Sequence, residues 1–337
     1  MIDLLRRHDP GLIELASEDG AVLVSPALQG RIFAHLEGDL LHQLDIERLE
    51  APLPGEFNNL GGNSLWPAPE GGPFAFNYMP GSGEWVVQAG IADQPASVTY
   101  LSKGEVEIEK QINLTNRHGT TLDLRFNRRI QIVGTPDLGG FPGLQGIAYH
   151  TSDTFEPLGS YREDEVLLAP WSLEQFPGGN GVTAFAKVKD PSTAINFDFY
   201  GMPESPPIYG EDFFSTSLGG TAKYQIGIKV ANEPEVLGAL DANRNLLLLR
   251  HTEKKDGLYF NIADNDQPEG PGSAADMYSV FNGGDLDFFE LETIAPMQIR
   301  DGLITTSSLH SASIMLRGPV PDLKLWVKNQ YGIDPAN

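Results

Sequence analysis

Glycine and proline interrupt this sequence at short intervals, and runs of alternating apolar and polar residues lie between them. The 37 glycines and 25 prolines leave no long stretch with the apolar stripe of an amphipathic helix. This pattern predicts an antiparallel all-β fold with many turns. The strands are expected at residues 20–26, 31–36, 106–114, 122–132, 182–188, 194–200, 224–230, 245–251, 258–262 and 288–295. Short helical segments are expected only at 234–240 and 322–330.

The domain organisation follows from the spacing of these loops. No tandem repeat and no low-complexity linker divides the chain. We therefore expect one large β-sandwich domain over residues 1–337, with its core at about 20–320 and a short C-terminal tail. Long loops of such a sandwich gather at its rim, where binding residues are commonly found.

Charge and composition exclude several classes of function. The chain has 46 Asp and Glu against 23 Lys and Arg, a formal charge of −23, whereas a nucleic-acid binder needs the opposite balance. An anionic membrane surface is disfavoured for the same reason. The chain has no cysteine, so disulfides, thiolate metal sites and cysteine nucleophiles are excluded.

The membrane and targeting signals are also weak. The aliphatic run at residues 246–249 is far shorter than a membrane helix. The double arginine at Arg6 and Arg7 comes too early for the apolar region of a signal peptide. We expect a cytoplasmic protein without a membrane partner, although a signal peptide removed earlier would leave no trace here. The sequence gives no prediction of oligomeric state.

Two carboxylates share one face of the predicted strand at 288–295. Glu290 and Glu292 alternate with the apolar residues on either side of them. Side chains two apart on a strand lie on one face, and two like charges so close push one pKa upward, which suits a general acid or base. The alternative is a solvated face of the strand.

An arginine lies on the apolar face of the strand at 122–132. Arg128 shares this face with Leu124 and Phe126, and Lys110 is placed in the same way on the strand before it. A buried guanidinium needs a partner. Glu290 or Glu292 is the natural candidate, either in a structural ion pair or with Arg128 as a cation at the floor of a ligand cleft.

Common catalytic and metal signatures are absent. The chain has no GxSxG, P-loop or GxGxxG motif, and its histidines form neither HxH nor HExxH. No metal site and no cofactor is predicted. His150 follows a glycine-rich loop and is either a catalytic candidate or a lone hydrogen-bonded histidine. Aromatic residues cluster from Trp66 to Trp85; they offer flat faces on which sugar rings stack, or they close one end of the sandwich.

Several segments, in order, resemble one family. They are GGNSLWPAPEGGPF at 61–74, LTN with GT at 114–120, RRI at 128–130, APWSL with FPGG at 169–179, YQIGI at 224–228, YSVFNGG at 278–284 and FELET at 289–293. This series is similar to uncharacterised bacterial proteins of the galactose-mutarotase-like superfamily, over about residues 20–320. The resemblance implies a super-sandwich of two large antiparallel sheets with a sugar-sized cleft.

The resemblance also implies site residues for an aldose 1-epimerase-like proton transfer on a sugar or glycan. Glu292 or Glu290 would be the base, His150 the acid and Arg128 the anchor for hydroxyls or a carboxylate. The family's histidine string, Asn-x-x-x-His-x-Tyr-Phe-Asn, has no counterpart, and His150 is the mid-chain substitute. Further substrate contacts are expected from Asn63, Trp66, Glu70, Trp171, Tyr278 and Asn282.

Two other functions stay open at this point. One is a carbohydrate-binding protein that keeps the cleft but lacks the acid. The other is a sugar lyase or hydrolase on the same fold, for which Tyr149 beside His150 is a candidate base.

Overall fold

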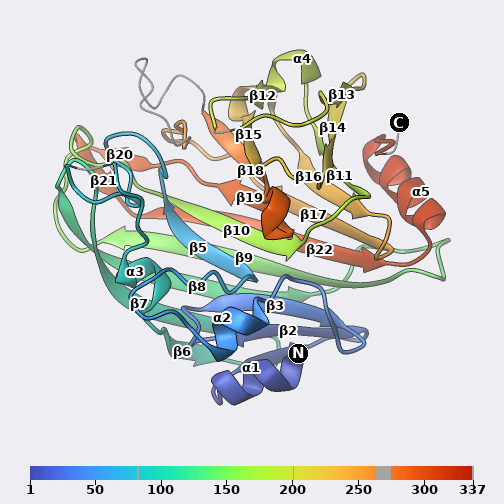
Figure 1. Cartoon of the computed structure of the whole chain (residues 1–337), viewed down its shortest axis with the longest axis horizontal. Helices are drawn as coiled ribbons and strands as arrows, with labels where there is room; N and C mark the ends of the chain where they lie inside the picture. The colour runs from blue at the N-terminus through green and yellow to red at the C-terminus, as the bar shows by residue number, and fades with distance from the viewer. Residues whose placement is uncertain (82, 200, 263–274, 336–337) are drawn as a thin grey trace.

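The computed structural model describes residues 1–81, 83–199, 201–262 and 275–335, and within them the chain forms two ten-stranded sheets (Figure 1). All strand pairs are antiparallel. The first sheet is ordered β1 (Ile13–Ala16), β2 (Gly20–Ser25), β3 (Arg31–Leu36), β5 (Asn63–Ala68), β10 (Ala169–Pro177), β19 (Phe288–Ile294), β18 (Asp276–Asn282), β15 (Tyr224–Lys229) and β12 (Ile195–Asn196), with β4 (Asp39–Leu40) paired to β3.

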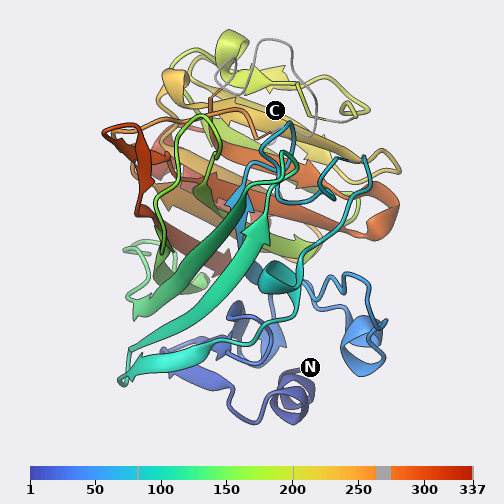
Figure 2. The ribbon, with the colours of Figure 1, turned by 90° about the vertical axis from the view of Figure 1, so that its left-hand side faces the viewer.

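The second sheet contains the longest strands. Figure 2 shows two of them, β7 and β8, side by side along the molecule. Its order is β13 (Ile208–Tyr209), β14 (Phe213–Leu218), β11 (Val182–Lys187), β16 (Val236–Asp241), β17 (Leu246–Thr252), β22 (Ser307–Arg317), β9 (Gln145–Pro157), β8 (Thr121–Val133), β7 (Glu105–Thr115) and β6 (Ser97–Leu101). A separate two-stranded ribbon pairs β20 (Gln298–Arg300) with β21 (Leu303–Thr305).

The helices are few and short. Most lie at the ends of the chain or in connections between strands (Figure 1). They are α1 (Ile2–His8), α2 (Ile46–Glu50), α3 (Ala89–Ala92), α4 (Pro191–Ala194) and α5 (Val320–Tyr331), with 3₁₀ turns η1 (Val230–Asn232) and η3 (Gly284–Leu286). No helix in the described ranges is long and apolar enough to cross a membrane.

The predicted all-β super-sandwich is confirmed, and most predicted strands match within a residue or two. The helix expected at 234–240 is wrong: this segment forms the fully buried strand β16, whose neighbours β11 and β17 complete its hydrogen bonds. The strand expected at 194–200 is reduced to β12, and 258–262 contributes only a bridge from Leu258 to Met297. The helix expected at 322–330 lies inside α5.

The main core lies between the two sheets. Its largest apolar cluster takes Val22 and Ile32 from the first sheet and Ile108 and Leu248 from the second. A second layer lies outside, where α5 packs Trp326 and other apolar residues against the second sheet. Alternation along each strand therefore decides which side chains enter the core and which reach an outer face.

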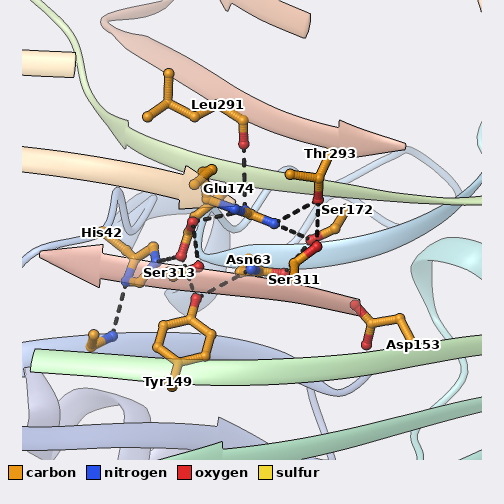
Figure 3. A network of polar contacts seen from close by, with 12 residues as sticks. His42, Asn63, Tyr149, Asp153, Ser172, Glu174, Leu291, Thr293, Ser311 and Ser313 are labelled. Atoms are coloured by element: carbon orange, nitrogen blue, oxygen red, sulfur yellow. Dashed lines mark hydrogen bonds and ion pairs between the residues drawn. The ribbon is translucent and has the colours of Figure 1, made fainter. Parts of the chain in front are cut away.

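A polar network crosses the interior of the sandwich (Figure 3). The Glu174 carboxylate on β10 accepts from Arg250 Nη1 on β17 at 2.7 Å, from Ser313 Oγ at 3.0 Å and from the Tyr149 hydroxyl. It also accepts from His42 Nε2 at 2.9 Å; the backbone N–H of Ala34 donates to His42 Nδ1, which fixes the tautomer. These contacts bind β10 of one sheet to three strands of the other.

The charge of Glu174 depends on these partners. Burial by itself raises the pKa of the Glu174 carboxyl group, but the charge of Arg250 and the hydrogen bonds from His42 and Tyr149 outweigh it and lower the pKa to about 2. Arg250 also donates to Ser172 Oγ and Thr293 Oγ1, so its guanidinium joins strands β10 and β19 as well.

We expect Arg250→Met to lower the free energy of unfolding by roughly 3–5 kcal/mol at pH 7, because it leaves the buried Glu174 carboxylate without its counter-charge. The pKa of Glu174 is lowered on folding. In the wild type, the charged carboxylate therefore adds to the free energy of unfolding at pH values above the pKa of Glu174 in the unfolded chain, and this contribution is lost as the pH falls towards about 2. The difference in free energy of unfolding between wild type and Arg250→Met should therefore be smaller at acidic pH. Urea unfolding at pH 7 and pH 3 measures both values. Arg129→Met removes an exposed arginine as a control, and an equal loss in both variants would contradict this assignment.

Candidate functional site

A cleft of about 720 Å³ opens on the outer face of the first sheet. Its floor consists of outward-facing side chains of five neighbouring strands, and its walls come from the segments that follow β4, β5 and β14 and from η3. The floor residues are Ser64, Trp66, Trp171, Leu173, Gln175, Gln225, Phe281 and Glu290. This volume lies within the range of small-molecule sites.

Glu290 and Glu292 lie side by side on the cleft face of β19, as their spacing predicts. Glu290 lines the cleft, whereas Glu292 has no exposed surface and lies next to it. Glu292 accepts from Trp171 Nε1 at 2.9 Å, from Gln225 Nε2 at 2.9 and 3.0 Å, and from the Ser279 hydroxyl. Glu290 accepts from Gln175 Nε2 at 2.6 Å.

The two carboxyl groups differ in their affinity for a proton. Burial raises the pKa of Glu290 well above its usual range, and the charge of Glu292 and a hydrogen bond between the two carboxyls raise it further. Burial also raises the pKa of Glu292, but its hydrogen bonds from Ser279, Glu290, Trp171 and Gln225 oppose that rise. Glu290 is therefore the carboxyl group of the pair with the higher affinity for a proton, and Glu292 is the one whose hydrogen bonds support its charged form.

Aromatic side chains form one side of the cleft. Trp66 and Trp171 meet edge to face with ring centroids 6.3 Å apart, and Phe57 contacts both Trp66 and Trp85. Trp85 is 43% exposed at the rim, and its Nε1 donates to Glu70 at 3.3 Å. The flat, exposed ring of Trp85 is suited to stacking against the apolar face of a ring-shaped ligand.

Four of the predicted site residues line this cleft: Glu290, Trp66, Glu70 and Trp171. Asn63 on β5 and Tyr278 on β18 point to the opposite face of the first sheet, into the interior, because they occupy the alternate positions of their strands, and Arg128 points into the same interior from β8 of the second sheet. Asn63 bonds to Arg128, Ser172 and Tyr149, and the Tyr278 hydroxyl contacts the backbone of Thr252. The predicted contacts of Asn63, Arg128 and Tyr278 with a ligand in the cleft are therefore corrected.

Arg128 forms a structural ion pair. Its guanidinium donates to Asp153 at 2.8 and 3.2 Å and to backbone oxygens of Gly30 and Asn63. The expected partners Glu290 and Glu292 were wrong, because Arg128 and the carboxylates lie on opposite faces of the first sheet. Lys110, also on an inner face, donates to the backbone oxygens of Gly90 and Gln94.

His150 does not face the carboxylates. It lies on the outer face of the second sheet, in a groove with His251 and His310, whereas its neighbour Tyr149 points inward to Glu174. The prediction of His150 as the acid opposite Glu292 is wrong, and the Tyr149–His150 pair does not form a site. Asn282 instead holds a loop together, through bonds to Gly219 and Ala222.

Sequence reasoning missed several residues of the cleft. Gln175 lies two positions beyond Leu173 on β10, and its amide oxygen is buried without a hydrogen-bond partner in the described chain. Arg31 begins a predicted strand and contributes a buried guanidinium. The alternation of β10 was a usable signal for Gln175, whereas the contribution of Arg31 depends on long-range strand order. No group of His, Asp and Glu in the described residues could hold a metal ion.

We expect Glu290→Gln to stabilise the protein by roughly 1–3 kcal/mol at pH 8 and to have little effect at pH 4. The pKa of Glu290 is raised on folding, so between its unfolded and folded pKa values the native state binds more protons, and wild-type stability falls as the pH rises. The glutamine stays neutral at both pH values. Urea unfolding at the two pH values measures the difference, with the exposed Glu18→Gln as control. Destabilisation of Glu290→Gln at pH 8 would contradict a neutral Glu290.

Comparisons with solved structures agree with this architecture. A putative aldose 1-epimerase from Escherichia coli K12 superposes with a TM-score of 0.53 at 11% identity, covering 91% of this chain and 98% of that one. The Slr1438 protein from Synechocystis sp. PCC 6803 gives 0.51 at 14% identity, with coverage of 91% and 94%. A galactose mutarotase-like protein from Lactobacillus casei gives 0.50 at 10% identity, with coverage of 91% and 99%.

These similarities show a galactose-mutarotase-like fold, as the sequence segments predicted. A comparison with curated proteins finds no match. One family model, described as a family of unknown function (DUF6786), matches residues 1–315. The chain therefore belongs to the DUF6786 family, an uncharacterised family with the galactose-mutarotase-like fold.

Proposed function

We propose that the protein binds a small carbohydrate in the cleft of the first sheet and that the Glu290/Glu292 pair catalyses proton transfer at the sugar ring, as in aldose 1-epimerisation. The observation that carries this proposal is a pair of adjacent buried carboxyl groups, of which Glu290 lines the floor of an aromatic-walled cleft and Glu292 lies beside it. The fold of the putative aldose 1-epimerase from Escherichia coli supports the same class of ligand.

The polar groups of the floor suit a hydroxylated ligand. The free amide oxygen of Gln175 is an acceptor for a hydroxyl group, and the Glu290 carboxyl lies beside it. A buried acceptor without a donor is costly, so a ligand hydroxyl that fills this position gains affinity. Trp85 and Phe57 supply the apolar surface for the ring.

Ring opening of an aldose requires only proton transfers. The anomeric hydroxyl loses a proton, the ring oxygen gains one, and the bond between the anomeric carbon and the ring oxygen breaks. Glu290 accepts the first proton while its own proton moves to Glu292, and the pair then returns one proton to the ring oxygen. The pair ends as it began, so this chemistry needs no added cofactor.

Proton NMR of anomer exchange with a panel of neutral and acidic aldoses tests this reaction. We expect the full-length protein to accelerate exchange of at least one sugar, and Glu290→Gln to lower that rate roughly 10²–10⁴-fold, the usual contribution of a general acid or base. Glu18→Gln should keep the wild-type rate. Exchange at the rate of buffer for every sugar would overturn the catalytic proposal.

A second function, carbohydrate binding without turnover, is favoured by one specific observation. No imidazole lines the cleft among the residues that the structure describes, so the acid that the family resemblance implies is missing. This alternative predicts sugar affinity in calorimetry without any acceleration of anomer exchange.

Both functions predict a role for the aromatic rim. We expect Trp85→Ala to weaken sugar binding roughly 5- to 10-fold in calorimetry, because the exposed indole face is lost while the buried floor stays intact. Tyr209→Ala, on the edge strand β13 of the other sheet, is the matched control for loss of an exposed aromatic ring. Equal sugar affinities of wild type and Trp85→Ala would show that the Trp85 indole does not contribute to sugar binding.

A further inference from the structure

The three buried arginines of the described chain differ in one respect. Arg128 is paired with Asp153 at 2.8 Å, and Arg250 is paired with Glu174 at 2.7 Å, both inside the sandwich. Arg31 is equally buried, at 2% exposure, but forms no ion pair with any described carboxylate. It is also the one of the three that lines the cleft.

The contacts of Arg31 hold its guanidinium in place without neutralising it. Nη1 donates to the backbone oxygen of Gly61 at 2.5 Å, and Nε donates to the side-chain oxygen of Gln29 at 3.0 Å. Both acceptors are uncharged, and Nη2 makes no hydrogen bond with the described residues. Burial lowers the pKa of Arg31 to about 10, the negative charge of Glu290 opposes this shift, and Arg128 adds to it.

The nearest carboxyl group on the cleft floor is not a full counter-charge. Burial and the neighbouring Glu292 raise the pKa of Glu290 well above its usual range, so Glu290 is a weak counter-charge for Arg31, and Glu292 accepts hydrogen bonds from Trp171, Gln225 and Ser279. A buried guanidinium without a counter-charge is costly, and the cost is recovered when an anion binds. Because a guanidinium donates in a planar fork, carboxylate and phosphate groups match it best.

Two more cations lie around the same cleft. Arg48 on α2 lines it and forms no ion pair with the described carboxylates, and Lys223, next to β15, lies over the Phe281 ring at 5.6 Å. Asp45 and Glu70 are the other acidic residues of the lining, and the Asp45 carboxylate accepts from the Arg48 backbone N–H. In a chain of net charge −23, the lining of this cleft therefore contains as many cations as acidic residues.

We propose that the ligand of this cleft is an anionic saccharide, with a carboxylate or phosphate group that pairs with Arg31 while Arg48 and Lys223 attract it at the rim. This inference rests on the proposed carbohydrate site and names its substrate class. It places the ligand's charged group towards the β3 side of the cleft.

Calorimetry with the full-length protein tests the proposal. The probes are D-glucuronate and D-galacturonate for a carboxylate, glucose 6-phosphate for a phosphate, and D-glucose and D-galactose as their neutral counterparts. We expect at least one acidic sugar to bind roughly tenfold or more tightly than its neutral counterpart, with an advantage that shrinks at high salt. Which acidic probe binds distinguishes the carboxylate from the phosphate.

Variants assign the preference to Arg31. We expect Arg31→Gln to remove the roughly tenfold advantage of the acidic sugar while changing the affinity for a neutral sugar less than about twofold. Arg31→Lys should keep part of the preference. Arg129→Gln removes the same charge from the exposed face of the second sheet and should change neither affinity. If Arg31→Gln is unfolded by circular dichroism, Arg48→Gln replaces it, with a smaller loss for the acidic sugar only.

The outcomes separate this inference from the proposed function. Equal or tighter binding of the neutral sugars, or an equal loss for both sugars in Arg31→Gln, overturns the anionic ligand but leaves a carbohydrate site. Absence of binding for every sugar, neutral and acidic, overturns the proposed function itself and the inference with it.

Discussion

The ion pair between Glu174 and Arg250 supports the rest of this structure. It joins the two sheets inside the sandwich, directly behind the strands that form the cleft floor. Arg250 also donates to Thr293 and to the Leu291 backbone oxygen, so it fixes the inner side of β19. Glu290 and Glu292 alternate with these residues on the same strand. The rigid inner face of β19 therefore orients the carboxyl pair on its outer face.

The two faces of the first sheet differ in how their charged side chains are paired. Inside, each charged group is paired with an opposite charge or bonded to backbone oxygens, as Arg128 and Lys110 are. On the cleft side, the charges are left incompletely matched: two carboxyl groups lie side by side, and Arg31 forms no ion pair with the described residues. Such imbalance is expected where a ligand completes the network, because a structural core would resolve it.

The fold could be predicted from sequence because alternation and turn residues act locally. The strand at 288–295 and the position of its two carboxylates on one shared face followed from a period of two alone. The helix expected at 234–240 failed because the β partners on both sides of β16 decide its conformation, and these partners are not visible in a local window. The same reason explains Arg128 and His150. Alternation shows that two residues share a face of their strand, but not which sheet that strand joins or which face meets the cleft.

The site was therefore recovered in part. Glu290 was expected from alternation, and Trp66, Glu70 and Trp171 lie in segments that carry the family resemblance; all four line the cleft. Arg31 was missed because its strand is remote from β19 in sequence and reaches the cleft only through β5 and β10. Long-range strand order was the missing information.

The C-terminal helix α5 has a consequence for the boundaries of the family. The family model ends at residue 315, yet α5 packs Leu323, Trp326 and Val327 against Leu247 and Leu249 of the second sheet. A chain cut at that boundary would present these leucines to water as a continuous apolar patch, which is a surface on which proteins self-associate. In this chain, the segment beyond the matched residues thus covers an apolar face of the second sheet.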